Sequence, residues 1–333
     1  MTFETQDVER KTLSILKVLA GEDEPMGSIV IARKLKDLGI DLGERAVRYH
    51  LRMMDEQGLT SLAGRRDGRV ITPLGRRELK QGMVRDKVGF ALSRIELLAF
   101  RTTFDLDKRR GMVPVNITVF RRADFQKALR IMKLVMDSRL TVSKLVAVGR
   151  AGEKIGDFIV PADSVGLATV CSIVVNGTLL KAGIPMDSKF GGLLQMQNGE
   201  PLRFVELIHY AGCSLDPSEI FIKAGMTSVL HTVKTGSGNV LANFREIPSI
   251  CRPIAHDVVS RLARASINGV LLFGSVSEAV CEVPVELNRV GIVLLGGLNP
   301  VAAVEESGIQ VESHAMSTVV DYKELVGFEE LLK

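Results

Sequence analysis

Hydrophobic positions in the first 80 residues follow a helical period and then change to two short strands. Three periodic segments span residues 8–19, 28–38 and 44–57, with glycine or proline between them. Two apolar runs, 59–63 and 69–72, flank a glycine-rich tip, as the strands of a hairpin do. The order of three helices and a hairpin predicts a winged helix-turn-helix domain.

The third predicted helix has two distinct faces. Val47, Leu51 and Met54 fall on one side at about 100° per residue. The opposite side carries Arg45, Arg48, Tyr49 and Arg52, and the hairpin adds Arg65, Arg66 and Arg69. A guanidinium group can bond the paired acceptors of guanine or clamp a phosphate oxygen. We predict that these seven residues bind DNA, although a charged helix face alone is usually a solvated surface.

Positive charge is concentrated in the same segment. Residues 45–85 hold ten Lys or Arg and four Asp or Glu, a local charge of +6, whereas the whole chain carries +4. The rest of the chain is therefore slightly acidic. This concentration predicts an electrostatic footprint for double-stranded DNA, with binding that weakens steeply as salt is added.

The remaining sequence indicates a helical connector and a larger second domain. Helical spacing continues over residues 83–104 and a polar run follows at 105–111. We predict a DNA-binding domain at 1–80, a connector at 81–111 and a regulatory domain at 112–333. The apolar face of the connector could pack against the second domain or a partner copy, or the helix could be a simple spacer.

Short Val- and Ile-rich runs with intervening helices make the second domain α+β or α/β. Residues 138–170 and 260–295 share the order Ser-Arg-Leu, apolar strand, Val-Pro and a second strand, at an offset of 122–125. This echo predicts a duplicated unit with pseudo-twofold symmetry and a ligand cleft between its halves. Chance similarity between Val-rich strands is the alternative.

Motifs for catalysis and metal binding are missing. The chain has no GxxxxGK[ST] loop, GxSxG elbow or HExxH motif, and its four cysteines and five histidines are widely scattered. We therefore predict no enzyme, no cofactor and no metal. No apolar segment approaches the roughly 20 residues that span a bilayer, which with the reduced cysteines indicates a cytoplasmic protein without membrane contact.

Several polar residues of the second domain could surround a small anion. The candidates for effector binding are Cys171, Ser172, Asn176, Lys181 and Arg245. Asn176-Gly177 is a turn signal, and the glycines at 191–192 and 236–238 could bring backbone N–H groups to a carboxylate. The plainer alternatives are glycines that serve turns, an Arg245 that pairs with a neighbouring acid, and a Cys171 that is a small buried hydrophobe.

The chain resembles the NrpR family of archaeal nitrogen-repression regulators over nearly its whole length. The motifs that carry the resemblance are Thr-Val-Cys-Ser at 169–172, Asn-Gly at 176–177, Gly-Ile-Pro at 183–185, Phe-Gly-Gly at 190–192, Leu-Asp-Pro at 215–217, Phe-Arg-Glu-Ile-Pro at 244–248 and Gly-Gly-Leu-Asn-Pro at 296–300. The resemblance implies an allosteric repressor of nitrogen fixation and assimilation genes, released from operator DNA by 2-oxoglutarate. It also ties the segment around Cys171 to the inducer response.

Some NrpR proteins carry two regulatory domains in tandem, whereas this chain has one after its winged helix. We therefore expect a homodimer, or a homologous partner that lacks the DNA-binding domain. Two other readings stay open: a repressor that answers a different small acid, and an enzyme with an accessory winged helix like the biotin ligase and repressor. The absence of a Gly-Arg-Gly nucleotide loop argues against the enzyme.

Overall fold

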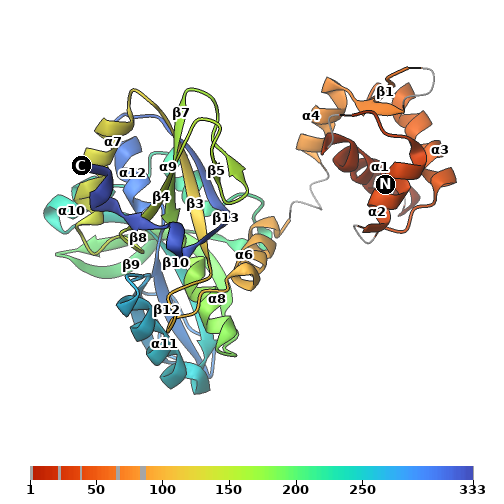
Figure 1. The fold of residues 1–333 in the computed structure, drawn as a ribbon. Helices are drawn as coiled ribbons and strands as arrows, with labels where there is room; N and C mark the ends of the chain where they lie inside the picture. The colour runs from red at the N-terminus through yellow and green to blue at the C-terminus, as the bar shows by residue number, and fades with distance from the viewer. Residues whose placement is uncertain (1–2, 22–23, 38–39, 65–67, 83–87, 333) are drawn as a thin grey trace. The chain divides into compact units, whose positions relative to one another are not determined.

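The computed structural model describes residues 3–21, 24–37, 40–64, 68–82 and 88–332 (Figure 1). Its contacts divide the chain into two compact units, Met1–Lys87 and Val88–Lys333. This division falls between the expected domain boundaries at residues 80 and 111. None of the described helices is long and apolar enough to cross a membrane.

The first unit is the predicted winged helix. Its elements are α1 (Phe3–Ala20), α2 (Ser28–Asp37), α3 (Glu44–Glu56), β1 (Thr60–Leu62), β2 (Arg69–Ile71) and α4 (Pro73–Gln81). β1 and β2 pair antiparallel. The apolar side of α3 packs against Ile15, Leu16, Ile31 and Leu35 in one buried cluster. The helical spacing in the sequence therefore identified the core of this unit.

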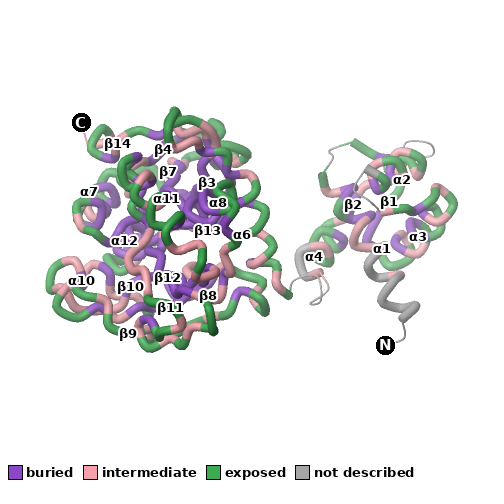
Figure 2. Tube along the Cα trace, turned by 90° about the horizontal axis from the view of Figure 1, so that it is seen from below, coloured by how far each residue is buried: buried purple, intermediate pink, exposed green. Residues whose placement is uncertain are grey.

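The second unit contains two five-stranded sheets, and every strand pair in them is antiparallel. One sheet has the order β13-β3-β7-β4-β14, from Glu312–Asp321, Met112–Arg121, Ser164–Val170, Leu145–Arg150 and Val326–Gly327. The other has the order β11-β12-β10-β8-β9, from Val270–Val276, Arg289–Leu295, Gly238–Pro248, Asp187–Gln197 and Glu200–His209. A small hairpin joins β5 (Lys154–Ile155) to β6 (Phe158–Ile159). Buried residues concentrate on the central strands (Figure 2).

Helices surround these sheets. They are α6 (Phe90–Arg101), α7 (Phe125–Met136), α8 (Ile173–Lys181), α9 (Pro217–Lys223), α10 (Val229–Thr235), α11 (Arg252–Arg264) and α12 (Asn299–Glu306), with short 3₁₀ turns at Tyr210–Gly212, Ser249–Cys251, Tyr322–Glu324 and Phe328–Leu332. The unit is therefore α+β, as expected.

The internal echo in the sequence corresponds to a structural duplication. The run β3-α7-β4-β7-α8-β8 is repeated as β10-α11-β11-β12-α12-β13. Each half gives its last strand to the sheet of the other half, because β8 pairs with β10 and β13 pairs with β3. The two halves are thus interlocked, and the loops after β7 and β12 are equivalent.

The predicted connector helix belongs to the second unit. In α6 the buried residues Ala91, Ile95 and Leu98 share a hydrophobic cluster with Cys171 and Met316. Of the alternatives left open by the sequence, packing against the second domain is the one that the structure shows.

The turn predicted at Asn176-Gly177 was wrong, because both residues lie inside α8. Gly177 is required there for close helix packing, since a Cβ atom would lie 2.3 Å from the Thr102 Cβ. Gly191 and Gly192 lie within β8 and not in a loop. Gly236 ends α10 with a left-handed φ of 78°.

Candidate DNA-binding surface and effector cavity

The exposed face of α3 carries the residues predicted to bind DNA. Arg45, Arg48, Tyr49 and Arg52 are all exposed. Arg48 pairs with Glu44, and Arg52 Nε lies 3.4 Å from Glu56 Oε1. Exposed pairs of this kind contribute about 0–1 kcal/mol. Both arginines can therefore exchange an intramolecular carboxylate for a phosphate or a base at little cost.

The predicted wing arginines differ in their surroundings. Arg69 lies on β2, its side chain is only 20% exposed, and its Nε donates to Asp55 Oδ2 at 2.7 Å. The other carboxylate oxygen of Asp55 accepts from Thr60 Oγ1 at 2.6 Å. Arg69 therefore joins the wing to α3. Arg65 and Arg66 lie outside the described residues.

A small cavity lies where the two halves of the second unit meet. Asn116 from β3, Asn243 from β10 and the loops at Ser172 and Gly297 line it. Asn116 and Asn243 are equivalent positions of the duplicated halves, and so are the loops at Ser172 and Gly297. The cavity therefore lies between the two halves, where the sequence predicted a ligand cleft. Its volume is about 20 Å³, which is room for about one water molecule.

Arg245 is the cation of this cavity. It is 1% exposed, and its guanidinium carbon lies 4.7 Å from the ring centre of Tyr210. Its Nη1 donates to the carbonyls of Phe244 and Phe190 at 3.2 and 3.5 Å. In the described part of the chain, Nε has no hydrogen-bond partner, and the charge of Asp216 acts on the guanidinium without forming an ion pair. A buried charge left in this state strongly favours an anionic ligand.

A hydrogen-bonded series of side chains borders the same cavity. The Tyr210 hydroxyl donates to Asn243 Oδ1 at 2.5 Å, and Asn243 Nδ2 donates to Ser172 Oγ at 3.3 Å. Burial raises the pKa of the Cys171 thiol to about 12. Cys171 is therefore a neutral, packed side chain and not a reactive thiolate.

Asp216 places a carboxyl group in the wall of the cavity. It caps α9 by accepting from the Ser218 N–H at 2.8 Å. Burial raises the pKa of Asp216, and the hydrogen bonds from Ser218 oppose this. An entering anion would meet both the guanidinium of Arg245 and this carboxyl group.

The structure brings together Cys171, Ser172 and Arg245 but not the other two predicted effector residues. Asn176 donates to Ser188 Oγ at 3.1 Å and lines a separate cavity of about 280 Å³ beside α6. Lys181, at the far end of α8, donates to the Phe100 carbonyl at 3.1 Å. Because α8 starts at the small cavity and runs away from it, its later residues lie elsewhere.

Sequence reasoning missed Asn116, Tyr210, Asp216 and Asn243. One signal was available for the two asparagines, since each interrupts an otherwise apolar strand. A buried amide in such a strand requires hydrogen-bond partners, which makes it a candidate for a polar site.

A larger cavity of about 390 Å³ adjoins the small one. Asp216, Ala315 and Met316 line both, and Arg94, Glu219, His314 and Asp157 add charged or titratable groups to the larger one. Its volume lies within the range of ligand pockets. Its charged groups are mainly acidic, however, so it suits an anion less well than the surroundings of Arg245.

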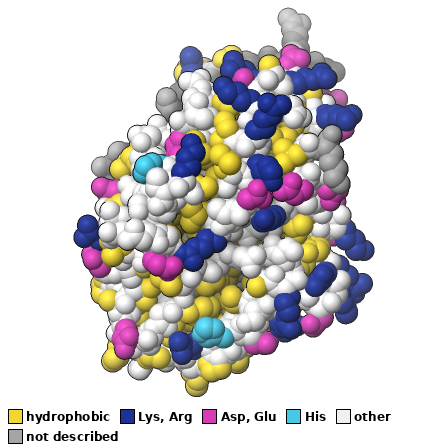
Figure 3. All heavy atoms as spheres, turned by 90° about the vertical axis from the view of Figure 1, so that its left-hand side faces the viewer, with side chains coloured by type: hydrophobic (Ala, Val, Ile, Leu, Met, Phe, Trp, Pro, Cys, Tyr) yellow, Lys and Arg dark blue, Asp and Glu magenta, His cyan; other side chains and the backbone are white. Residues whose placement is uncertain are grey.

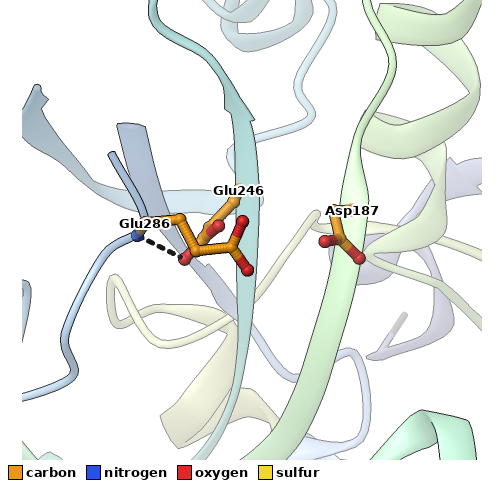
Figure 4. A group of neighbouring side chains, drawn as sticks. All are labelled: Asp187, Glu246 and Glu286. Atoms are coloured by element: carbon orange, nitrogen blue, oxygen red, sulfur yellow. Dashed lines mark hydrogen bonds between the residues drawn. The ribbon is translucent and has the colours of Figure 1, made fainter. Parts of the chain in front are cut away.

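Three carboxylates, Asp187, Glu246 and Glu286, come close enough to suggest a cation site (Figure 4). Lys189 Nζ already lies 2.8, 3.5 and 2.5 Å from their oxygens. Burial lowers the pKa of Lys189, but hydrogen bonds to Asp187 and Glu286 outweigh this and raise it overall. The ammonium group thus fills the position that a metal ion would take.

Charges elsewhere are mixed. On the face drawn in Figure 3, Lys and Arg side chains alternate with Asp and Glu side chains and with hydrophobic atoms. Local pairs such as Lys133–Asp137, at 2.7 Å, neutralise each other.

Comparison with known families decides the assignment. Residues 88–326 match the family model of the NrpR regulatory domains NRD1 and 2. The chain belongs to the NrpR family. Residues 13–79 match the ribonuclease R winged-helix domain, in agreement with the fold of the first unit. The family assignment makes the chain a nitrogen regulator with a DNA-binding winged helix and excludes the alternative of an enzyme.

Two relatives support this assignment. The chain is 38% identical over 316 residues to the global nitrogen regulator NrpRI of Methanosarcina mazei, with 95% of this chain and 97% of the relative covered. It is 32% identical over 328 residues to the global nitrogen regulator NrpR of Methanococcus maripaludis, with 96% of this chain and 56% of the relative covered. The chain thus spans about half the length of that second relative.

A solved structure shares the fold. The crystal structure of a nitrogen repressor-like protein from Methanococcus jannaschii matches with a TM-score of 0.61 and 26% sequence identity. The match covers 72% of this chain and 98% of the solved one.

Proposed function

We propose that this NrpR protein represses nitrogen fixation and ammonia assimilation genes and leaves its operator when 2-oxoglutarate binds around Arg245. The observation that carries the proposal is the buried guanidinium of Arg245, whose Nε has no hydrogen-bond partner among the described residues. A dicarboxylate supplies the missing negative charge. The resemblance of the chain to a family of nitrogen repressors favours 2-oxoglutarate over other acids.

The surroundings of Arg245 suit an anion in two further ways. α8 and α12 both begin at the loops that line the cavity, and helix N-termini favour negative charge. Asn116 and Asn243 add one amide from each half. Together these groups match a ligand with two carboxylates and a carbonyl.

The size of the cavity bears on how an effector would enter it. A volume of about 20 Å³ does not admit a dicarboxylate, so the effector requires an open form. A ligand that binds only the open form shifts the population toward it. We assign the closed cavity to the DNA-binding form and the open cavity to the released form.

On DNA, two copies would place their α3 helices in successive major grooves of a palindromic operator. The exposed Arg45, Arg48, Tyr49 and Arg52 would contact bases and phosphates, and the wing would contact the backbone or minor groove. A homologous protein without a winged helix is the alternative partner to a second copy.

The test is a promoter-binding titration at fixed salt. Fluorescence anisotropy would follow binding of the full chain to its own upstream region and to nitrogen-gene promoters, while 2-oxoglutarate or succinate is added. Release by 2-oxoglutarate and not by succinate supports the proposal. Release by succinate alone assigns another acid, and binding indifferent to both acids contradicts effector control by this cavity.

A further inference from the structure

β13 contains an irregular segment that forms part of the cavity wall. His314 pairs with Ile117 of β3, and the next pair is Thr318 with Val115, so four steps on β13 oppose two on β3. We call the three residues between these pairs, Ala315 to Ser317, the β13 bulge. Met316 has a left-handed φ of 50°, a conformation that a residue with a side chain adopts only when its surroundings hold it.

Three side chains hold the β13 bulge from three directions. Asn116 Oδ1 accepts from the Met316 N–H at 3.0 Å, and Glu219 Oε1 accepts from the Ala315 N–H at 2.6 Å. Arg94 Nε donates to the Met316 carbonyl at 2.5 Å, and Arg94 Nη2 donates to the Ser317 carbonyl at 2.7 Å. The bulge is therefore attached both to the cavity, through Asn116, and to α6, through Arg94.

α6 lies next to the boundary between the two units. The helix begins at Phe90, directly after the boundary between the two units at Lys87 and Val88. Its buried face also packs on Met316 and on Cys171 of the cavity. α6 is thus the element through which a change at the cavity reaches the chain segment that leads to the winged helix.

We propose that the β13 bulge transmits occupancy of the cavity to α6, with Arg94 as the coupling residue. This rests on the proposed function. Ala315 and Met316 of the bulge line the cavity, so the opening that admits an effector displaces the bulge. Asn116 is placed to respond, because its Nδ2 has only a long contact of 3.5 Å to Thr169 and can turn to a carboxylate. Displacement of Met316 then removes both acceptors of Arg94 and frees α6 from the bulge.

The test separates effector binding from release. Arg94→Ala is expected to bind operator DNA without effector about as tightly as the wild type. It should bind 2-oxoglutarate at least as tightly, because the bulge has lost a contact that holds it. In the wild type, 2-oxoglutarate should weaken operator binding by about 5 to 150-fold, the usual range of allosteric coupling. In Arg94→Ala the same titration should change operator binding less than about 2-fold, far below that range.

A matched control removes an arginine that is distant from the bulge. Arg121 pairs with Asp124 on the surface. 2-Oxoglutarate should therefore release Arg121→Ala from operator DNA as it releases the wild type. If Arg94→Ala does not fold, Arg94→Lys keeps the charge but not the two parallel donors, and its release should be intermediate. Normal release of both Arg94 variants overturns the transmission through the bulge and leaves the proposed function intact.

Hydrogen exchange supplies a second readout. Addition of 2-oxoglutarate to the wild type should speed exchange of the Ala315 and Met316 amides. Unchanged exchange in a protein that binds 2-oxoglutarate and is released by it would also overturn the inference. A wild type that binds no 2-oxoglutarate would overturn the proposed function first, and the inference with it.

Discussion

Asn116 and Asn243 occupy equivalent positions on the central strands of the two sheets and line the same cavity. The preceding residues pair equivalently, Val115 with Val170 and Ala242 with Leu295. Because each half contributes one amide, the site exists only where the halves interlock. Its pseudo-symmetry suits a ligand with an acid group at each end.

Replacing either asparagine by alanine should weaken effector binding about fivefold, since one hydrogen bond contributes roughly 1 kcal/mol. Isothermal titration of Asn116→Ala and Asn243→Ala with 2-oxoglutarate would measure this. Asn243→Ala should also lower the free energy of unfolding by about 1–3 kcal/mol, because the Tyr210 hydroxyl loses its acceptor. Asn268→Ala, at an exposed position, is the control. Equal affinities in all three variants would place the ligand elsewhere.

Arg245→Met should abolish the response to 2-oxoglutarate without lowering stability. The buried guanidinium leaves its Nε without a hydrogen-bond partner among the described residues, so an apolar side chain of similar length removes a desolvation penalty. Thermal unfolding and operator titration check the two parts. A loss of several kcal/mol of unfolding free energy would instead mark Arg245 as a structural residue.

The sequence was sufficient for the winged helix because local patterns determine it. The apolar spacing of Val47, Leu51 and Met54 gave both the core and, on the opposite side, the exposed arginines. The duplication was also visible in the sequence, as the order of motifs that residues 138–170 and 260–295 share. The exchange of β8 and β13 between the halves was not visible. Pairing of residues as distant in sequence as Gly192 with Ala242, or Val115 with Thr318, leaves no local signal.

The candidate site was only partly predictable for the same reason. Cys171 and Ser172 stood out because they precede an Asn-Gly turn signal, and Arg245 because it supplies a cation in the run Phe-Arg-Glu-Ile-Pro. The predicted turn at Asn176 was wrong. An Asn-Gly pair usually makes a turn, but here close packing of α8 on Thr102 overrides that preference. Tyr210 and Asp216 come from a segment that joins the site only through tertiary packing.

Effector binding should depend on pH through Asp216. Burial raises the pKa of its carboxyl group, and a bound dianion would raise it further, so binding should take up a proton. Affinity should then fall as the pH rises through this pKa. Asp216→Asn keeps the cap of α9 but removes the charge, and should bind 2-oxoglutarate more tightly with no proton uptake. Calorimetry in buffers of different ionisation enthalpy measures the proton directly.

The raised pKa of Asp216 also makes the stability of the protein depend on pH. A carboxyl whose folded-state pKa is raised makes the folded state hold its proton longer than the unfolded state. The free energy of unfolding therefore falls as the pH rises from the ordinary carboxyl pKa of 3.8 to the raised value. Asp216→Asn should remove this part of the pH dependence. Weaker binding of 2-oxoglutarate by Asp216→Asn would contradict the proposed repulsion between the Asp216 carboxylate and the effector.

Gly177→Ala should destabilise the second unit by about 1–3 kcal/mol, the usual cost of overpacking. The new Cβ atom would lie 2.3 Å from Thr102 Cβ and 2.8 Å from the Ala99 carbonyl oxygen, so α8 and α6 would have to separate. Gly212→Ala meets no atom within 4 Å and serves as the control. Similar melting temperatures for both variants would show that the two helices can separate without cost.

Arg48→Ala tests the DNA-binding face of α3. If Arg48 contacts a base, the substitution should cost about 1–3 kcal/mol on the operator and much less on random DNA. The loss of its exposed pair with Glu44 should leave stability within about 1 kcal/mol. Arg110→Ala, exposed in the second unit, should bind both DNAs normally. An equal loss on both DNAs, with a salt dependence reduced by about one ion, would make Arg48 a phosphate contact.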